Sequence, residues 1–300
     1  MPRACGGGAA SILPIRPFAP IGPSTLTSPA AGWSPPGIDT TVPSVARVYD
    51  AILGGRDNFE VDREAAQTFM WHIPQAKQVA WSNRAALIRG VQYMVRQAGI
   101  DQILDIGCGL PTKQNTHEAA QEINPATRVV YVDNDPMVLA HGRALLANNE
   151  NTTVVTADLR DPQAILDDPV VHEYLDFDRP VGVMLIGMIM LISDDEGPDD
   201  IIATLMEPLA PGSHLFITDW PDTGDPAQHA LSRACLETLG NGWARPLDEV
   251  RSRFQGMEMV PPGLDYIARW FPEDPEKPVA EFEDLESHER TMMAGIAVKR

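Results

Sequence analysis

Short apolar runs alternate with amphipathic segments along most of this chain. The runs are too short to be helices, and the run at 181–187 is apolar on both faces, as a central parallel strand must be. We predict strands at 103–106, 128–133, 152–157, 181–187 and 214–218. Strands and helices that alternate at this spacing predict an α/β fold with a doubly wound, mostly parallel sheet.

Helices are expected between these strands and after the last of them. Asn115 and Glu118 are spaced as a capping box at the start of one helix, and Pro136 begins another that ends near Ala147. The other predicted helices cover 82–98, 162–167, 170–175, 198–209, 226–239 and 246–254. Further strands are predicted at 257–260 and 293–298, and the acidic, proline-bearing stretch between them, 272–289, is interpreted as a surface excursion.

The first 40 residues differ from the rest of the chain. They are rich in Pro, Gly, Ala, Ser and Thr and have no hydrophobic periodicity, so burial of apolar surface cannot offset their ordering entropy. We predict a disordered tail at 1–40 and a single domain at 41–300. Within that domain, 41–99 are expected to form a helical cap and 100–300 the α/β core.

The expected cap contains a polar loop. Apolar residues at helical spacing over 45–52 predict a helix that Gly54 and Gly55 terminate, and Asp62 is expected to start the next helix. The polar residues 56–58 lie between the two helices. The segment is either a plain helix–loop–helix cap or a lid that closes over a ligand, and the residues alone favour the plain cap because loops are polar by default.

The strand at 103–106 leads into the turn Gly107-Cys108-Gly109. Glycines allow the backbone to turn sharply and to approach a ligand closely. A strand, a glycine turn and a helix form the nucleotide-binding corner of an open α/β sheet, where ligands lie beyond the carboxyl ends of the strands. The spacing alone is a weak signal, because the third glycine of a dinucleotide fingerprint is absent.

Three aspartates, Asp105, Asp133 and Asp158, lie at the ends of three neighbouring predicted strands and should line one crevice. Asp133 is suited to accept hydrogen bonds from both ribose hydroxyls of a cofactor, and Asp158 from an adenine amino group. NAD and S-adenosylmethionine both carry these groups. The acid-rich crevice and the long turn after Gly109 favour S-adenosylmethionine, which carries a sulfonium and an ammonium, over NAD, whose pyrophosphate prefers a helix amino end.

Composition narrows the expected partners. Lys and Arg total 23 against 42 Asp and Glu, and a net charge of −19 repels the phosphates of duplex nucleic acid. No apolar run approaches the ~20 residues of a membrane span. The three cysteines, Cys5, Cys108 and Cys235, are odd in number and far apart, which predicts neither a disulfide framework nor a zinc site and suits a reducing cytoplasm. We expect no metal site.

Longer motifs carry a specific resemblance. Residues 104–109 and 131–136 resemble the first two motifs of class I S-adenosylmethionine-dependent methyltransferases. The chain from about Pro43 to its end resembles, more specifically, the S-adenosyl methyltransferase family formerly known only as a domain of unknown function. The motifs that carry this resemblance are 46–50, 53–59, 105–107, 109–112, 129–136 and 157–162.

The resemblance implies a seven-stranded fold in which the last two predicted strands form an antiparallel hairpin, with S-adenosylmethionine as cofactor. We expect methyl transfer to an unidentified acceptor that is a small molecule. It also makes the 54–58 loop a candidate lid. The predicted cofactor-binding residues are Asp105, Gly107, Gly109, Asp133, Asn134, Asp158, Leu159, Asn58, Arg56 and Tyr49.

Two positions depart from the family pattern: Cys108 stands where Thr is expected, and Met190 where His is expected. The polar candidates near the crevice mouth are Tyr49, Asp57, Asp219 and Asp222, and none of them is assigned as a catalytic residue. Two alternatives stay open, a non-catalytic S-adenosylmethionine-binding regulator and an NAD-dependent oxidoreductase, because related folds serve all three functions.

Overall fold

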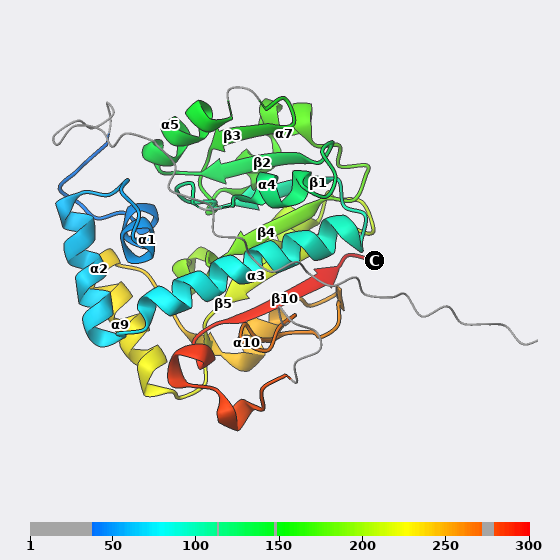
Figure 1. Ribbon diagram of the computed structural model, residues 1–300. Helices are drawn as coiled ribbons and strands as arrows, with labels where there is room; N and C mark the ends of the chain where they lie inside the picture. The colour runs from blue at the N-terminus through cyan, green and yellow to red at the C-terminus, as the bar shows by residue number, and fades with distance from the viewer. Residues whose placement is uncertain (1–37, 113, 147–148, 272–278) are drawn as a thin grey trace, which may run out of the picture.

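A central β-sheet organises the chain (Figure 1). The computed structural model describes residues 38–112, 114–146, 149–271 and 279–300, so most of the expected tail and part of the 272–289 stretch lie outside the described residues. The parallel strands are β1 (Gln102–Ile106), β2 (Arg128–Asp133), β3 (Thr152–Thr156), β4 (Gly182–Ile186) and β5 (His214–Asp219). Each agrees with its predicted range to within a residue or two.

The order of the strands is β3-β2-β1-β4-β5-β10-β8. The chain builds outward from β1 to β3 and then returns to the other side of β1 with β4, where Ile103 lies between Val129 of β2 and Gly182 of β4. The direction of winding therefore reverses between β1 and β4. Ligands of open α/β sheets bind at the carboxyl ends of the strands at such a reversal.

The predicted antiparallel pairing at the end of the chain is confirmed in a modified form. The strand β10 (Met293–Val298) lies between β5 and β8 (Glu258–Met259) and is antiparallel to both. A short strand, β9 (Asp265–Tyr266), also pairs with β10. Two residues each of β6 (Pro221–Asp222) and β7 (Arg245–Pro246) form a separate parallel pair.

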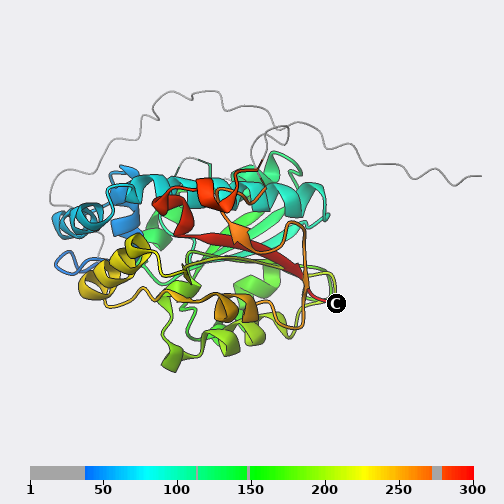
Figure 2. The same cartoon turned by 90° about the horizontal axis from the view of Figure 1, so that it is seen from below.

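Helices cover both faces of the sheet (Figure 2). One face packs against α3 (Ala76–Arg96), α4 (Thr116–Gln121) and α5 (Pro136–Leu145), and the other against α6 (Pro162–Leu166), α7 (Pro169–Tyr174) and α8 (Pro198–Met206). Within β2, Val129 and Tyr131 face the first layer while Val130 and Val132 face the second. Successive side chains of a strand point to opposite faces, so both sets are apolar because both faces are buried.

Local sequence signals set several helix starts. The side chains of Asp135, Asp161 and Asp168 each accept a hydrogen bond from a backbone amide in the first turn, and a proline follows each of them. The predicted capping box of Asn115 and Glu118 is present at α4.

The N-terminal cap consists of α1 (Val45–Leu53) and α2 (Glu60–His72), and α2 contacts α9 (Pro226–Leu239) (Figure 1). The cap predicted at 41–99 included α3, but α3 also covers one face of the sheet. A β-carbon on Gly90 of α3 would lie 2.1 Å from Cε1 of Phe216 in β5, so glycine is what allows this close packing. The prediction that Asp62 starts α2 was wrong: the helix begins at Glu60, and Asp62 is a buried residue of its first turn.

The remaining elements are α10 (Leu247–Ser252) and the 3₁₀ turns η1 (Ile189–Leu191), η2 (Asp194–Glu196), η3 (Phe282–Asp284) and η4 (Ser287–Arg290). None of the helices in the described ranges is both long enough and apolar enough to cross a membrane.

Candidate active site

A pocket of about 250 Å³ lies beyond the carboxyl ends of β1, β2, β3 and β4, with residues of α1 and α3 completing its wall. Eight of the ten predicted cofactor-binding residues line it: Tyr49, Asp105, Gly107, Gly109, Asp133, Asn134, Asp158 and Leu159. Arg56 and Asn58 lie outside the lining. The three strand-end aspartates thus share one crevice, as the parallel arrangement of the strands requires.

The glycine turn after β1 is shaped by two left-handed residues, Gly107 with φ 74° and Gly109 with φ 66°. A β-carbon on Gly107 would lie 2.0 Å from the sulfur of Met188, so the loop after β4 packs directly on this turn. Beside Gly109, by contrast, no heavy atom of the described residues lies within 4 Å of such a carbon. Backbone exposed at that position leaves room for a ligand to approach closely.

Asp133 joins two loops of the pocket. Its carboxylate accepts hydrogen bonds from the amide of Gly109 at 2.9 Å and from the amide of Asp135 at 3.0 Å. Burial raises the pKa of this carboxyl group, and the two amides oppose the shift. The side chain is therefore held in one orientation, with lone pairs left for further hydrogen bonds.

Asp105 is the most deeply buried acid of the pocket, with 2% of its surface exposed. Its carboxylate accepts a hydrogen bond from the hydroxyl of Thr116 at 2.6 Å. Burial raises its pKa from 3.8 to about 6, while the Thr116 hydroxyl and the charge of Arg84 act in the opposite direction.

Asp158 has a partner that sequence reasoning missed. The guanidinium of Arg160 forms a fork with both of its oxygens, and Asn134 donates a further hydrogen bond at 3.0 Å. The hydrogen bonds from Arg160 hold the pKa of this carboxyl group well below its usual range. The spacing of an acid and an arginine two residues apart, directly after a strand, is the signal that could have indicated the pair.

The 54–58 loop is folded onto Asp50, an α1 residue in the wall of the pocket. Asp50 accepts hydrogen bonds from the amide of Asp57 at 2.9 Å and from the side chain of Asn58 at 2.7 Å. Gly55 packs so closely that a β-carbon there would lie 1.8 Å from the Asp50 carboxylate. On the other side of the loop, Asp57 lies 3.6 Å from Nε2 of His141 in α5.

The pocket wall also contains residues that sequence reasoning missed. Those after β4, Met188, Leu191 and Ile192, are apolar, and the others are Asn83, Arg84, Leu87 and Asn241. Asn83 accepts a hydrogen bond from Thr218 at 2.8 Å and lies 3.5 Å from the hydroxyl of Tyr49. A signal existed for Asn83, because it interrupts the apolar stripe formed by Val79 and Leu87 at four-residue spacing.

The other polar candidates of the crevice mouth are not in the pocket wall. Asp219, at the end of β5, is buried and has a pKa raised by burial to about 6, whereas Asp222 is exposed beside His229. Met190, where the family pattern suggests histidine, is 2% exposed and packs in the hydrophobic core. The departure at position 190 therefore does not change a residue that lines the pocket.

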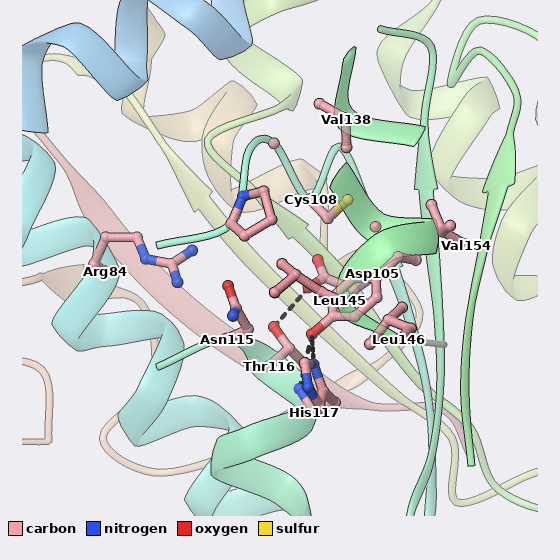
Figure 3. A pocket seen from close by; sticks show the side chains of 14 residues that line it. Arg84, Asp105, Cys108, Asn115, Thr116, His117, Val138, Leu145, Leu146 and Val154 are labelled. Atoms are coloured by element: carbon pink, nitrogen blue, oxygen red, sulfur yellow. Dashed lines mark hydrogen bonds between the residues drawn. The ribbon is translucent and has the colours of Figure 1, made fainter. Parts of the chain in front are cut away.

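A smaller cavity of about 30 Å³ lies behind the glycine turn, between α4 and α5 (Figure 3). Here Nδ1 of His117 and the hydroxyl of Tyr131 are 2.8 Å apart. The cavity shares Arg84 and Asp105 with the larger pocket, but its volume suits an ordered water molecule rather than a cofactor.

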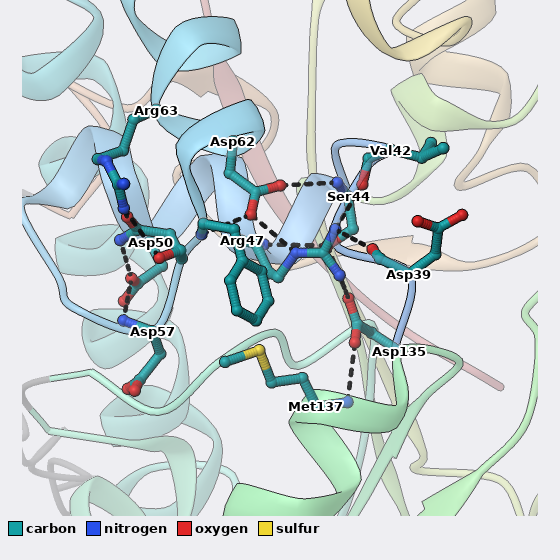
Figure 4. Close-up of polar contacts among 12 residues, drawn as sticks. Asp39, Val42, Ser44, Arg47, Asp50, Asp57, Asp62, Arg63, Asp135 and Met137 are labelled. Carbon is teal, nitrogen blue, oxygen red and sulfur yellow. Dashed lines mark hydrogen bonds and ion pairs between the residues drawn. The ribbon is translucent and has the colours of Figure 1, made fainter. Parts of the chain in front are cut away.

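Arg47 ties the cap to the sheet (Figure 4). Its Nε donates to the carboxylate of Asp62 at 2.9 Å, and its Nη2 donates to the carbonyl of Val42 at 2.6 Å. The guanidinium also lies 4.0 Å from Asp135, which caps α5 and accepts a hydrogen bond from Ser44 at 2.6 Å. Both Arg47 and Asp62 are buried, so the pair positions α1 over the pocket.

In the described part of the chain, no group of three or more His, Cys, Asp or Glu side chains is arranged to hold a metal ion. Several buried polar atoms do lack partners among the described residues, and three of them belong to residues of the pocket wall: Nε of Arg84, Oγ1 of Thr112 and Oδ1 of Asn241. Buried polar atoms are nearly always hydrogen-bonded, so these three mark positions of the wall that a polar ligand or a water molecule would satisfy.

An open parallel sheet with a pocket at this position defines a Rossmann-like protein of the class that binds nucleotide cofactors. Residues 31–300 match the model of the S-adenosyl methyltransferase family, so the chain belongs to that family. Its cofactor is S-adenosylmethionine, and it is a methyltransferase.

Two solved structures are similar over nearly their whole length. A proposed methyltransferase from Thermobifida fusca YX is 50% identical, with a TM-score of 0.85 over 90% of this chain and 100% of that one. A DUF574 family protein from Streptomyces avermitilis MA-4680 is 34% identical, with a TM-score of 0.81 over 87% and 99% of the two chains. No match was found among curated proteins.

Replacing Arg47 with Met should destabilise the protein by about 3–5 kcal/mol, because Asp62 is left as an uncompensated buried charge. Urea unfolding measures the loss, with Arg63→Met as the exposed control in the same cap. The double variant Arg47→Met/Asp62→Asn should lose less than the single one. An effect of Arg47→Met no larger than that of Arg63→Met would contradict the role of the pair.

Asp105→Asn should raise the melting temperature of the ligand-free protein at pH 8 but not at pH 4. Because its folded pKa is raised to about 6, Asp105 binds a proton more tightly in the folded chain than in the unfolded one. Stability linked to this group is greatest below about pH 4 and declines as the pH rises to about 6. Removing the charge should recover on the order of 2–3 kcal/mol at pH 8. Equal shifts at the two pH values, or the same shifts with exposed Asp195→Asn, would refute this assignment.

Proposed function

We propose that the chain transfers the methyl group of S-adenosylmethionine to a small molecule bound at the β4 end of the pocket. The observation that carries the proposal is the set of apolar side chains in the wall there, Leu87 of α3 with Met188 and Leu191 after β4. Because the pocket of about 250 Å³ also holds the cofactor in this proposal, the space left beneath α1 suits a compact acceptor with apolar surface better than an extended polymer.

In this proposal the cofactor lies across the ends of β3, β2 and β1. Asp158, Asn134 and Leu159 contact the adenine, and Asp133 accepts hydrogen bonds from the ribose hydroxyls. Gly109 provides close backbone approach, and Gly107 forms the turn beside it. Asp105 faces the ammonium group. These roles follow the order of the strands and the acceptor-only character of an ionised carboxylate.

Bound S-adenosylmethionine supplies an electrophilic methyl group on sulfur, with a neutral thioether as leaving group. The task of the chain is then alignment, which contributes up to ~7–11 kcal/mol to lowering a barrier of this kind. The hydroxyl of Tyr49 donates to the carbonyl of Ala80 at 2.9 Å, and burial raises its pKa, so Tyr49 is poorly suited as a base. We therefore propose an acceptor that is nucleophilic without enzymic deprotonation, such as a neutral amine, a thiolate or an acidic hydroxyl.

The 54–58 loop is proposed to act on the cofactor through Asp50 rather than by direct contact. The loop closes on Asp50 with hydrogen bonds from Asp57 and Asn58, and Asp50 lines the pocket. A ligand that fixes Asp50 would then stabilise the loop in the same conformation.

Label from the methyl group of S-adenosylmethionine should appear in the low-molecular-weight fraction of a cell extract incubated with the protein. Asp133→Ala should weaken cofactor binding by about 1.5–3 kcal/mol, the range for hydrogen bonds to a charged group, and should reduce transfer accordingly. Calorimetry measures the binding. Label confined to macromolecules would refute the small-molecule acceptor, and tight binding without transfer to any fraction would favour the non-catalytic alternative.

Hydrogen exchange at residues 53–60 should slow when S-adenosylmethionine or its demethylated product binds, because the ligand stabilises the Asp50 contacts of the loop. Asn58→Ala, which deletes one of these contacts, should weaken cofactor binding by about 1 kcal/mol with little change in the melting temperature of the ligand-free protein. Exposed Arg56→Ala is the control. Exchange that is already slow and indifferent to ligand would identify the loop as a structural cap.

A further inference from the structure

Arg84 of α3 is a cation in the pocket wall, and most of its donors have no hydrogen-bond partner among the described residues. Its Nη2 donates to the carbonyl of Gln114 at 2.9 Å, the one hydrogen bond that its guanidinium makes to a described residue. Its Nε is buried and has no partner there. No carboxylate of the described residues lies within 4.0 Å of the Arg84 guanidinium, the distance that defines an ion pair. Arg160 differs, because its guanidinium is paired with Asp158.

Thr112 presents a second unused group beside the same stretch of chain. Its amide donates to Asn115 at 3.1 Å, but its hydroxyl oxygen is buried without a hydrogen-bond partner among the residues described. Thr112 also lines the pocket. The hydrogen bond from Arg84 to Gln114 holds the guanidinium against the loop that contains Thr112. A buried donor without a partner is unfavourable, so two pocket-lining residues that each carry one favour a ligand with acceptor oxygens.

The charges around Arg84 specify that ligand further. Asp105 lies near enough for the positive charge of Arg84 to lower the pKa of its carboxyl group. Asp50 lines the same pocket and is also buried. The pocket therefore offers a guanidinium with a buried carboxylate, Asp105, near it, which is the complement of a zwitterion that carries both a carboxylate and an ammonium.

We propose that Arg84, with the hydroxyl of Thr112, binds the carboxylate at the amino-acid end of S-adenosylmethionine. The inference rests on the proposed arrangement of the cofactor, and adds a residue outside the recognised motifs. Arg84 thereby makes the pocket selective for adenosyl thioethers and sulfoniums that retain the carboxylate. Decarboxylated S-adenosylmethionine lacks this group, and 5′-deoxy-5′-methylthioadenosine lacks the whole amino-acid end.

Calorimetry with these ligands and with S-adenosylhomocysteine tests the assignment. Wild-type protein should bind S-adenosylmethionine about 10- to 100-fold more tightly than its decarboxylated form, the usual effect of a charge-assisted hydrogen-bonded pair. Arg84→Met should remove this preference and weaken binding of S-adenosylhomocysteine by a similar factor. Binding of methylthioadenosine should change less than about twofold. Thr112→Val should give the same pattern with a smaller loss.

Arg96→Met, which removes an exposed charge from the last turn of the same helix, should leave the affinity for every ligand unchanged. Because Arg84 also holds the carbonyl of Gln114, Arg84→Lys serves as the variant that keeps the charge but loses the planar fork. It should retain the fold and part of the preference for the carboxylate.

Equal losses for S-adenosylhomocysteine and methylthioadenosine would show that Arg84 only supports the loop, and would overturn the inference. Unchanged affinity in Arg84→Met would do the same. In either case, binding of S-adenosylmethionine by the wild-type protein would leave the proposed function intact. Wild-type protein that binds none of these nucleosides would overturn both proposals.

Discussion

The pocket depends on buried carboxylates, two of them in strands of the parallel sheet and one in α1. Burial raises the pKa of Asp50, Asp105 and Asp133, so each is held in surroundings that disfavour its charged form. Hydrogen bonds from backbone amides and from Thr116 offset only part of this penalty. A cationic ligand would supply the missing counter-charge, which explains how an acid-rich crevice suits a sulfonium cofactor and discourages a pyrophosphate.

A network of hydrogen bonds and ion pairs links the cap to the sheet. Asp135, which follows β2, caps α5. The same carboxylate accepts a hydrogen bond from the hydroxyl of Ser44 and lies beside the guanidinium of Arg47. Arg47 in turn pairs with Asp62 at the start of α2. The roof of the pocket and the loop that carries Asp133 are therefore positioned by one polar network, although they are far apart in sequence.

Much of the fold was predictable because its signals are local. Apolar runs located the five parallel strands, and the capping box at Asn115 located the start of α4. Asp105, Asp133 and Asp158 were expected in one crevice because strands of a parallel sheet end at the same edge. The helix predicted at 82–98 is longer at its start, because α3 begins at Ala76. Its close packing on the sheet was not predictable, because Gly90 contacts Phe216 in a strand more than a hundred residues away.

The succession of strands and helices along the chain, the glycine turn and the acids at the strand ends were all predictable, because each is encoded by a few adjacent residues. Which polar groups meet depends instead on how the elements pack. The tertiary structure brings Asn83 to Thr218 and places Asn241 in the pocket, and it leaves Arg84 without a carboxylate partner among the described residues. It also folds the 54–58 loop onto Asp50 and buries Met190 in the core. The physical reason is that hydrogen bonding and burial depend on distances in space, whereas sequence patterns report only which face of an element a residue occupies.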